Sequence, residues 1–166
     1  FEEELKLYHG GIYFEMAGHV IDMMVAILGA PKKVTPFLGH HREGHPGTFV
    51  DNGMAVFEYE RAWGVIEVPQ LEVAPNQRRI EVFGSEGAVV IPHLGSGHLP
   101  NKDLQSVEVF REGESGWKTL ELRAATLHIS DLREFAAVLG RKKPPDYSLE
   151  HDEAVQEALL RSSGMA

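Results

Sequence analysis

The sequence has no cysteine, and it has few basic residues relative to its acids. Without cysteine there are no disulfide bonds, no thiolate metal ligands and no cysteine nucleophile. The chain carries 16 Lys and Arg against 25 Asp and Glu, a formal net charge of −9, so we expect no nucleic-acid partner. The absence of cysteine is compatible with the cytoplasm, where we expect the protein to be found.

Patterns that would identify a cofactor site directly are also missing. No Gly-x-Gly-x-x-Gly stands between a predicted strand and a predicted helix, so the chain shows no dinucleotide site of its own. The segment Gly84-Ser85-Glu86-Gly87 lacks the lysine of a phosphate-binding loop and is followed by a strand-like sequence, so it is predicted to be a turn. We therefore expect no cofactor to be bound by this chain alone.

The sequence also lacks a long apolar run that is free of charge. The most apolar stretch, residues 9–29, contains Glu15, His19 and Asp22, and each of these side chains is costly to place in lipid. We expect no transmembrane segment, no signal peptide and no membrane partner.

The order of the predicted elements is helix, strands, helices. A length of 166 residues with 43% hydrophobic content fits one globular domain over residues 1–166. Residues 9–29 have the apolar coverage of a buried helix. The middle alternates with period two, and two helices follow, one beginning at Ser130 or Asp131 and the other at Ser148. The predicted strands are Val34–Leu38, Phe49–Tyr59, Gly64–Val68, Arg79–Phe83, Ala88–Ile91, Ser106–Arg111 and Trp117–Leu122.

This order predicts the α+β class, with a single antiparallel β-sheet and helices packed on one of its faces. Short turns between the strands favour a meander over crossover units. The other face of the sheet is expected to be apolar, as Met54, Val56, Val65 and Val107 suggest. We expect a second copy to cover that open face, so that the protein is a homo-oligomer, a dimer or a tetramer.

Three polar residues of the first helix are candidates for chemistry. Glu15, His19 and Asp22 stand at i, i+4 and i+7, so their side chains should point into the same space. One interpretation is a histidine general acid/base steadied by Glu15, with Asp22 bonding a substrate hydroxyl. The other is a structural network on a buried helix, and spacing alone favours this second interpretation.

Metal binding is a lower-ranked alternative. Glu15 and His19 could share one ion with His9, although no His-Glu-x-x-His is present. Three further histidines lie in a loop rich in glycine and proline, and two more lie in a later loop. The three could bind zinc or copper, but for both loops we favour solvated surface histidines. These histidines are His40, His41 and His45 in the first loop, and His93 and His98 in the second.

The stretch HGGIYFEMAGHVIDMMVAILGAPKKV resembles the start of the C-terminal domain of the Gfo/Idh/MocA oxidoreductases, which include glucose–fructose oxidoreductase and inositol dehydrogenase. The family pattern GG-x-x-x-(D/E)-x-x-x-H-x-x-D is matched in register by Gly10, Gly11, Glu15, His19 and Asp22. The later segments RRIEVFGSEGAVVI and DLREFAAVLGRKKPPDYSLEHDEAVQEALLRSS resemble the family's hairpin and closing helices. The resemblance thus spans almost the whole chain.

The resemblance implies an NAD(P)-dependent oxidoreductase that moves a hydride to or from a hydroxyl- or carbonyl-bearing carbon, often of a sugar or polyol. His19 would transfer the proton or bind the hydroxyl, and Glu15 would replace an acidic partner that is more often Asp. Asp22, Gly11 and Tyr13 would contact the substrate. The NAD(P)-binding Rossmann domain, with the lysine it contributes, lies outside these residues, so we expect no activity from this chain alone.

Two hypotheses remain at the level of sequence. The first is the substrate-binding and oligomerisation domain of an NAD(P)-dependent oxidoreductase that acts on a sugar or polyol, with this chain as a piece of a longer enzyme. The alternative is a non-catalytic dimerisation or binding module that retains only this domain.

Overall fold

The computed structural model describes residues 9–43, 49–69, 78–94, 104–123 and 129–166. Within it the chain divides into two compact units. The first comprises residues 1–72 together with 146–166, and the second comprises residues 73–145. Each unit has its own antiparallel sheet, so each is described by itself.

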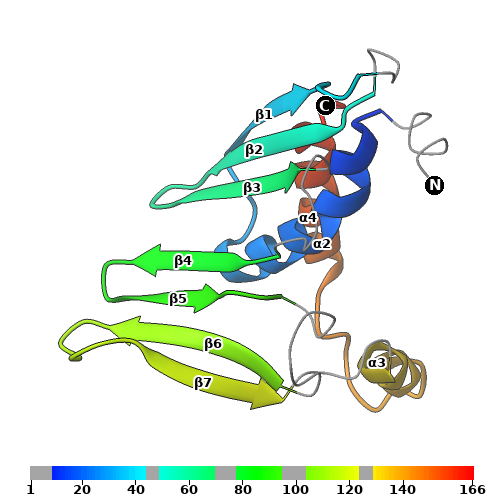
Figure 1. Cartoon of the computed structure of the whole chain (residues 1–166). Coiled ribbons are helices and arrows are strands. Elements are labelled where there is room, and N and C mark those ends of the chain that lie inside the picture. Colours follow the sequence, from blue (N-terminus) through cyan, green and yellow to red (C-terminus); the bar gives the residue numbers. More distant parts are fainter. Residues whose placement is uncertain (1–8, 44–48, 70–77, 95–103, 124–128) are drawn as a thin grey trace. The chain divides into compact units, whose positions relative to one another are not determined.

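The first unit is a three-stranded sheet with two helices (Figure 1). Its strands β1 (Lys33–Gly39), β2 (Asn52–Glu58) and β3 (Trp63–Pro69) pair antiparallel in the order β1-β2-β3. Helices α2 (Gly11–Leu28) and α4 (Leu149–Ser162) pack against each other and against the sheet. Pro36 lies in β1, an edge strand of this sheet, which is where proline is tolerated within sheets.

The core of this unit follows from the alternation of β2. Gly53, Ala55 and Phe57 are buried on the helix side, and the residues between them are half-buried on the other side. Ala17 and Ile21 of α2 pack against that inner face as part of one apolar cluster. The α4 members of the cluster are Ala154, Val155, Ala158 and Leu159, the stripe predicted from the sequence.

Glycine at the start of α2 lets the helix touch the chain entering β2. Gly11 has a φ of 52°, and a Cβ built there would lie 2.2 Å from the carbonyl oxygen of Val50. The next residue, Ile12, donates its N–H to that same oxygen at 3.2 Å. Tyr13 is fully buried over Gly53, where a Cβ would lie within 2.5 Å of the tyrosine ring. Backbone therefore packs on backbone here, which a side chain at Gly11 would prevent.

By length and composition, α2 is the helix among the described residues that could cross a membrane. Its inner face instead forms the centre of the apolar core of the first unit, as a core helix of a globular protein does.

The second unit holds a four-stranded sheet in the order β4-β5-β6-β7. Its strands β4 (Ile80–Gly84) and β5 (Gly87–Ile91) form a hairpin around Ser85 and Glu86, and β6 (Leu104–Arg111) and β7 (Lys118–Arg123) form another. Helix α3 (Ile129–Leu139) also belongs to this unit. Both hairpins were predicted from the sequence.

The predicted single sheet is wrong, because the strands form two sheets of three and four strands. Turn signals identify which strands are joined by a hairpin, but they do not say which hairpins share an edge, and ten residues separate β3 from β4. The predicted start of the penultimate helix is also wrong, since Ser130 and Asp131 lie inside α3.

The outer face of the three-stranded sheet is partly apolar, as predicted. Phe37, Trp63 and Val65 are exposed there, Trp63 by 80%, and Met54 and Val56 are half-buried. Val107, which we expected to be similarly exposed, is instead buried in the second unit.

The contact at Gly11 yields a stability prediction. Gly11→Ala should lower the free energy of unfolding by about 1–3 kcal/mol, because the new methyl must enter a left-handed backbone that abuts a carbonyl. The matched control is Gly18→Ala in the same helix, where the Cβ would meet only a Leu159 methyl at 3.6 Å. That change should be neutral or stabilise by up to about 1 kcal/mol. Urea denaturation measures both, and equal effects of the two variants would refute the prediction.

Candidate functional site

Three polar residues predicted from the sequence lie on the outer face of α2. The buried residues of this helix include Tyr13, Ala17 and Ile21, which point to the sheet. At 100° per residue, Glu15 and His19 fall on the opposite side, and both are exposed. Asp22 shares this side, and its side chain is 47% exposed.

The three side chains do not form the structural network that spacing alone favoured. Among the described residues, neither Glu15 nor His19 has a hydrogen-bond or ion-pair partner. Asp22 is paired, but with a residue of another helix. An exposed imidazole one turn from an exposed carboxylate is free to handle a proton for a bound molecule.

Sequence reasoning missed the partner of Asp22. His151, in the first turn of α4, places its Nε2 2.8 Å from Oδ1 of Asp22. The ring of Tyr147 stacks on this imidazole at a centroid distance of 4.4 Å. Since 129 residues separate the two members of the ion pair, helical spacing could not reveal it. The sequence offered one signal for this contact, which is that His151 stands three residues after the predicted N-cap Ser148.

The opposite flank of the polar face is apolar. Phe49, from the segment entering β2, is buried against Ile12 and half-buried Met16. These two α2 residues stand three positions before Glu15 and His19, on the neighbouring ridge of the helix. The polar face of α2 is therefore bordered by α4 on one side and by Phe49 on the other.

The other two predicted site residues lie beneath this face. Gly11 contacts the Val50 backbone, and the Tyr13 ring is buried against Gly53. Burial raises the pKa of the Tyr13 hydroxyl to about 12, and the nearby Ser162 hydroxyl offsets a small part of that rise, although the two lack hydrogen-bond geometry. Both residues have a packing role here, and their assignment as substrate contacts stays a prediction.

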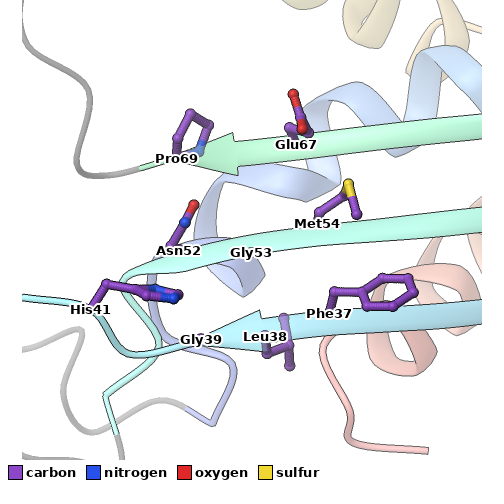
Figure 2. Close-up of a pocket in the computed structure, with 9 residues that line it drawn as sticks. All are labelled: Phe37, Leu38, Gly39, His41, Asn52, Gly53, Met54, Glu67 and Pro69. Atoms are coloured by element: carbon purple, nitrogen blue, oxygen red, sulfur yellow. The ribbon is translucent and has the colours of Figure 1, made fainter.

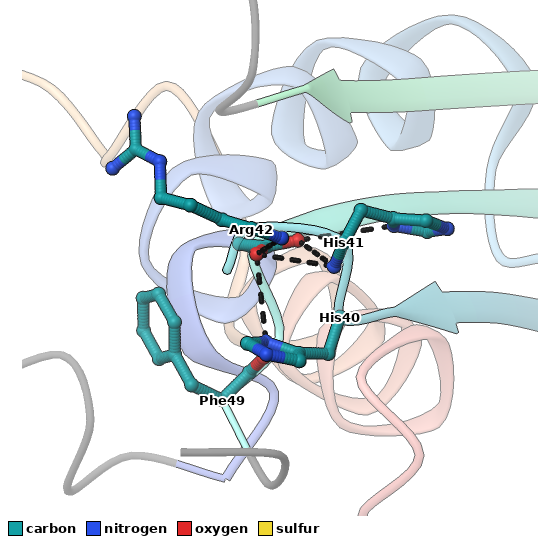
Figure 3. A network of polar contacts seen from close by, with 5 residues as sticks. His40, His41, Arg42 and Phe49 are labelled. Atoms are coloured by element: carbon teal, nitrogen blue, oxygen red, sulfur yellow. Dashed lines mark hydrogen bonds and ion pairs between the residues drawn. The ribbon is translucent and has the colours of Figure 1, made fainter. Parts of the chain in front are cut away.

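A buried carboxylate fixes the segment that carries Phe49 (Figure 3). Asp51 is fully buried and accepts hydrogen bonds from the backbone N–H of His41 at 2.9 Å and of Arg42 at 2.8 Å. His40 donates from Nδ1 to the Phe49 carbonyl at 2.8 Å and lies 3.5 Å from the same carboxylate. The network ties residues 40–42, which follow β1, to Phe49 and Asp51, which precede β2.

The protonation state of Asp51 follows from these contacts. Burial alone would raise the pKa of this carboxyl group, but the N–H groups of Arg42 and His41 and the imidazoles of His40 and His41 outweigh it. The pKa of Asp51 therefore lies below its usual range, and the group is ionised at neutral pH.

The histidines of this loop do not gather as metal ligands. Among the described residues, no group of three or more His, Asp or Glu side chains is placed to hold a metal ion. His40 and His41 flank Asp51, whose two oxygens are taken up by backbone N–H groups. His45 and His98 lie outside the described residues.

A shallow groove of about 600 Å³ lies on the outer face of the three-stranded sheet (Figure 2). Most of the strand residues that line it share that face by register, while the helices cover the other face. The groove is thus separate from the polar face of α2. Its lining consists of Phe37, Leu38, Gly39, His41, Asn52, Gly53, Met54, Glu67 and Pro69.

Comparison with known proteins gives one family match. The sequence pattern of the GFO/IDH/MocA C-terminal domain matches residues 2–90, more than half of the chain. A comparison with curated proteins gives no significant match.

Solved structures share the fold over nearly the whole chain. A "putative oxidoreductase" from Klebsiella pneumoniae is similar with a TM-score of 0.73 at 15% identity, over 93% of this chain and 47% of that one. A "putative nadph-dependent oxidoreductase" from Desulfitobacterium hafniense gives 0.68 at 13% identity, over 93% and 45%. The WlbA dehydrogenase from Bordetella pertussis, in complex with NADH and UDP-GlcNAcA, gives 0.59 at 18% identity, over 89% and 41%. The chain thus spans about half the length of these proteins.

The Asp51 network predicts how stability depends on pH. Because the folded-state pKa lies below the unfolded value of about 4, the contribution of Asp51 is complete above that value. It is lost as the pH falls through the folded-state pKa. Asp51→Asn should therefore cost about 1–3 kcal/mol of unfolding free energy at pH 7, and the cost should shrink below about pH 4. Denaturation across pH 3–7 tests this, with exposed Glu153→Gln as the control. A cost that does not vary with pH would contradict it.

Proposed function

Because the chain belongs to the Gfo/Idh/MocA family as its C-terminal domain, we propose that it is the substrate-binding and oligomerisation domain of an NAD(P)-dependent oxidoreductase. The reaction would oxidise or reduce a hydroxyl- or carbonyl-bearing carbon of a sugar or polyol. Two structural relatives support the cofactor class, one being named NADPH-dependent and the other holding NADH with a nucleotide sugar.

The observation that carries this proposal is the polar face of α2. It presents the exposed imidazole of His19, which has no partner within the described part of the chain, and the carboxylates of Glu15 and Asp22. Helix α4 borders this face on one side and Phe49 on the other. A structural role would bury or pair these groups. Their exposure suits a surface on which a hydroxyl-rich molecule lies, covered by another part of the protein.

His19 would handle the proton of the reaction. When a hydroxyl-bearing carbon is oxidised, the carbon loses a hydride and the oxygen loses a proton, and a neutral imidazole within hydrogen-bond reach accepts that proton. Glu15, one turn away, can accept a hydrogen bond from the other ring nitrogen and thereby hold the tautomer. Asp22 can accept a hydrogen bond from a second hydroxyl.

NAD(P) does not fit the residues of this chain. The sequence has no Gly-x-Gly-x-x-Gly between a strand and a helix, and the polar face of α2 is acidic rather than cationic. The dinucleotide would be bound by a separate domain, and this chain would supply substrate and proton contacts.

The outer face of the three-stranded sheet is the proposed oligomer contact. Phe37, Trp63 and Val65 form an exposed apolar surface on the side away from the helices. Soluble proteins rarely leave such a sheet face uncovered. The same face favours a second candidate function, a non-catalytic dimerisation or binding module. A strand–Gly-x-Gly-x-x-Gly–helix segment encoded upstream of Phe1 would favour the enzyme over this module.

The role of His19 is tested in the longest protein that the gene encodes. His19→Ala should lower turnover of an aldose or inositol with NAD⁺ or NADP⁺ about 100- to 10,000-fold, because the imidazole that takes the proton is removed. The unfolding free energy should stay within about 0.5 kcal/mol, since His19 is exposed. His93→Ala, another exposed histidine, is the control. Unchanged turnover in His19→Ala would exclude the assigned role.

The oligomer contact is tested by charge. Val65→Glu or Phe37→Glu should convert the wild-type dimer or tetramer to monomer at micromolar concentration, because a carboxylate would be buried unpaired in the interface. Ile27→Glu, at an exposed apolar position on α2, should leave the oligomer intact. Sedimentation velocity measures all three. A monomeric wild type would count against this contact.

A further inference from the structure

His151 is held in place from three directions. Its backbone N–H donates to the Ser148 hydroxyl at 3.3 Å, in the N-cap of α4. Its ring stacks on Tyr147 with an interplanar angle of 23°, and its Nε2 lies 2.8 Å from Oδ1 of Asp22. The His151 side chain is only 12% exposed, whereas Tyr147 is exposed. The imidazole is therefore a rigid donor whose direction is set by α4.

The contact between Asp22 and His151 is expected to contribute little to stability. Asp22 is 47% exposed, and pairs with so much access to water typically contribute about 0–1 kcal/mol. A ring stack and a hydrogen bond converge on this imidazole, and the N-cap fixes the backbone that carries it, which together are more than so weak a contact requires. Their combined effect is to fix the rotamer of the Asp22 carboxylate.

Fixing Asp22 leaves its second oxygen available. His151 takes Oδ1, and Oδ2 has no partner among the described residues. Asp22 stands three residues after His19 on the same face of α2, which places their Cβ atoms about 5–6 Å apart. Two groups at that spacing can each bond one of two adjacent hydroxyls.

We propose that His151 is a positioning residue, which orients Asp22 so that Oδ2 accepts a hydrogen bond from the hydroxyl next to the one His19 binds. The substrate class is then a sugar or polyol with two neighbouring hydroxyls. This rests on the proposed function of His19 and Asp22.

The test uses the longest protein that the gene encodes and the aldose or inositol that it oxidises fastest. His151→Phe keeps an aromatic ring for Tyr147 but removes the donor, so kcat/KM should fall about 10- to 100-fold with little change in unfolding free energy. His151→Gln should restore most of that loss, because its amide nitrogen can occupy the place of Nε2. Asp22→Ala should lower kcat/KM at least as much as His151→Phe does. The double variant should have the same kcat/KM as Asp22→Ala alone.

The neighbouring hydroxyl gives a readout that a structural role would not move. With the deoxy analogue of the same sugar, lacking that hydroxyl, His151→Phe and wild type should have similar kcat/KM. An equal loss on both sugars, or no loss in His151→Phe, overturns the positioning role while the proposed function stands. If wild type oxidises no aldose or inositol, the proposed function fails and the positioning role falls with it. Should His151→Phe not fold, the same comparison is made with His151→Leu, which also removes the donor to Asp22.

Discussion

The close approach of α2 to the strand β2 is the contact on which the rest of the first unit depends. Gly11 lies directly against the Val50 carbonyl just before β2, and the absence of a side chain at Gly53 leaves room for the Tyr13 ring on the strand. This contact fixes the rotation of α2 about its own axis. Because the rotation is fixed, the apolar residues face the sheet and Glu15 and His19 face outward.

The polar face is therefore a consequence of packing on the opposite side of the helix. Phe49 packs on this flank, and Asp51, two residues later, is bonded to the backbone of His41 and Arg42. A buried acid with fixed N–H donors is a rigid anchor, since any displacement would leave a charge without partners. The geometry of the polar face therefore depends on the packing of the core beneath it.

Local sequence signals predicted the elements well and their long-range assembly poorly. Periodicity located α2 and the strands, and the N-cap Ser148 located the start of α4. The division into two sheets was not predicted, because strand alternation does not encode which edges pair. Glu15, His19 and Asp22 could be placed on one face because helical spacing is a local property. His151 could not, since its place beside Asp22 depends on how α4 packs after the whole chain has folded.

The position of α4 in the chain has a consequence for biosynthesis. This helix packs along α2, although residues 29–148 separate the two helices in the sequence. During translation α2 emerges before α4 and stays without this neighbour until the residues of α4 have been synthesised. The side of α2 that contacts α4 lacks its partner throughout that interval, and the carboxylate of Asp22 acquires its partner His151 only when α4 has formed and packed against α2.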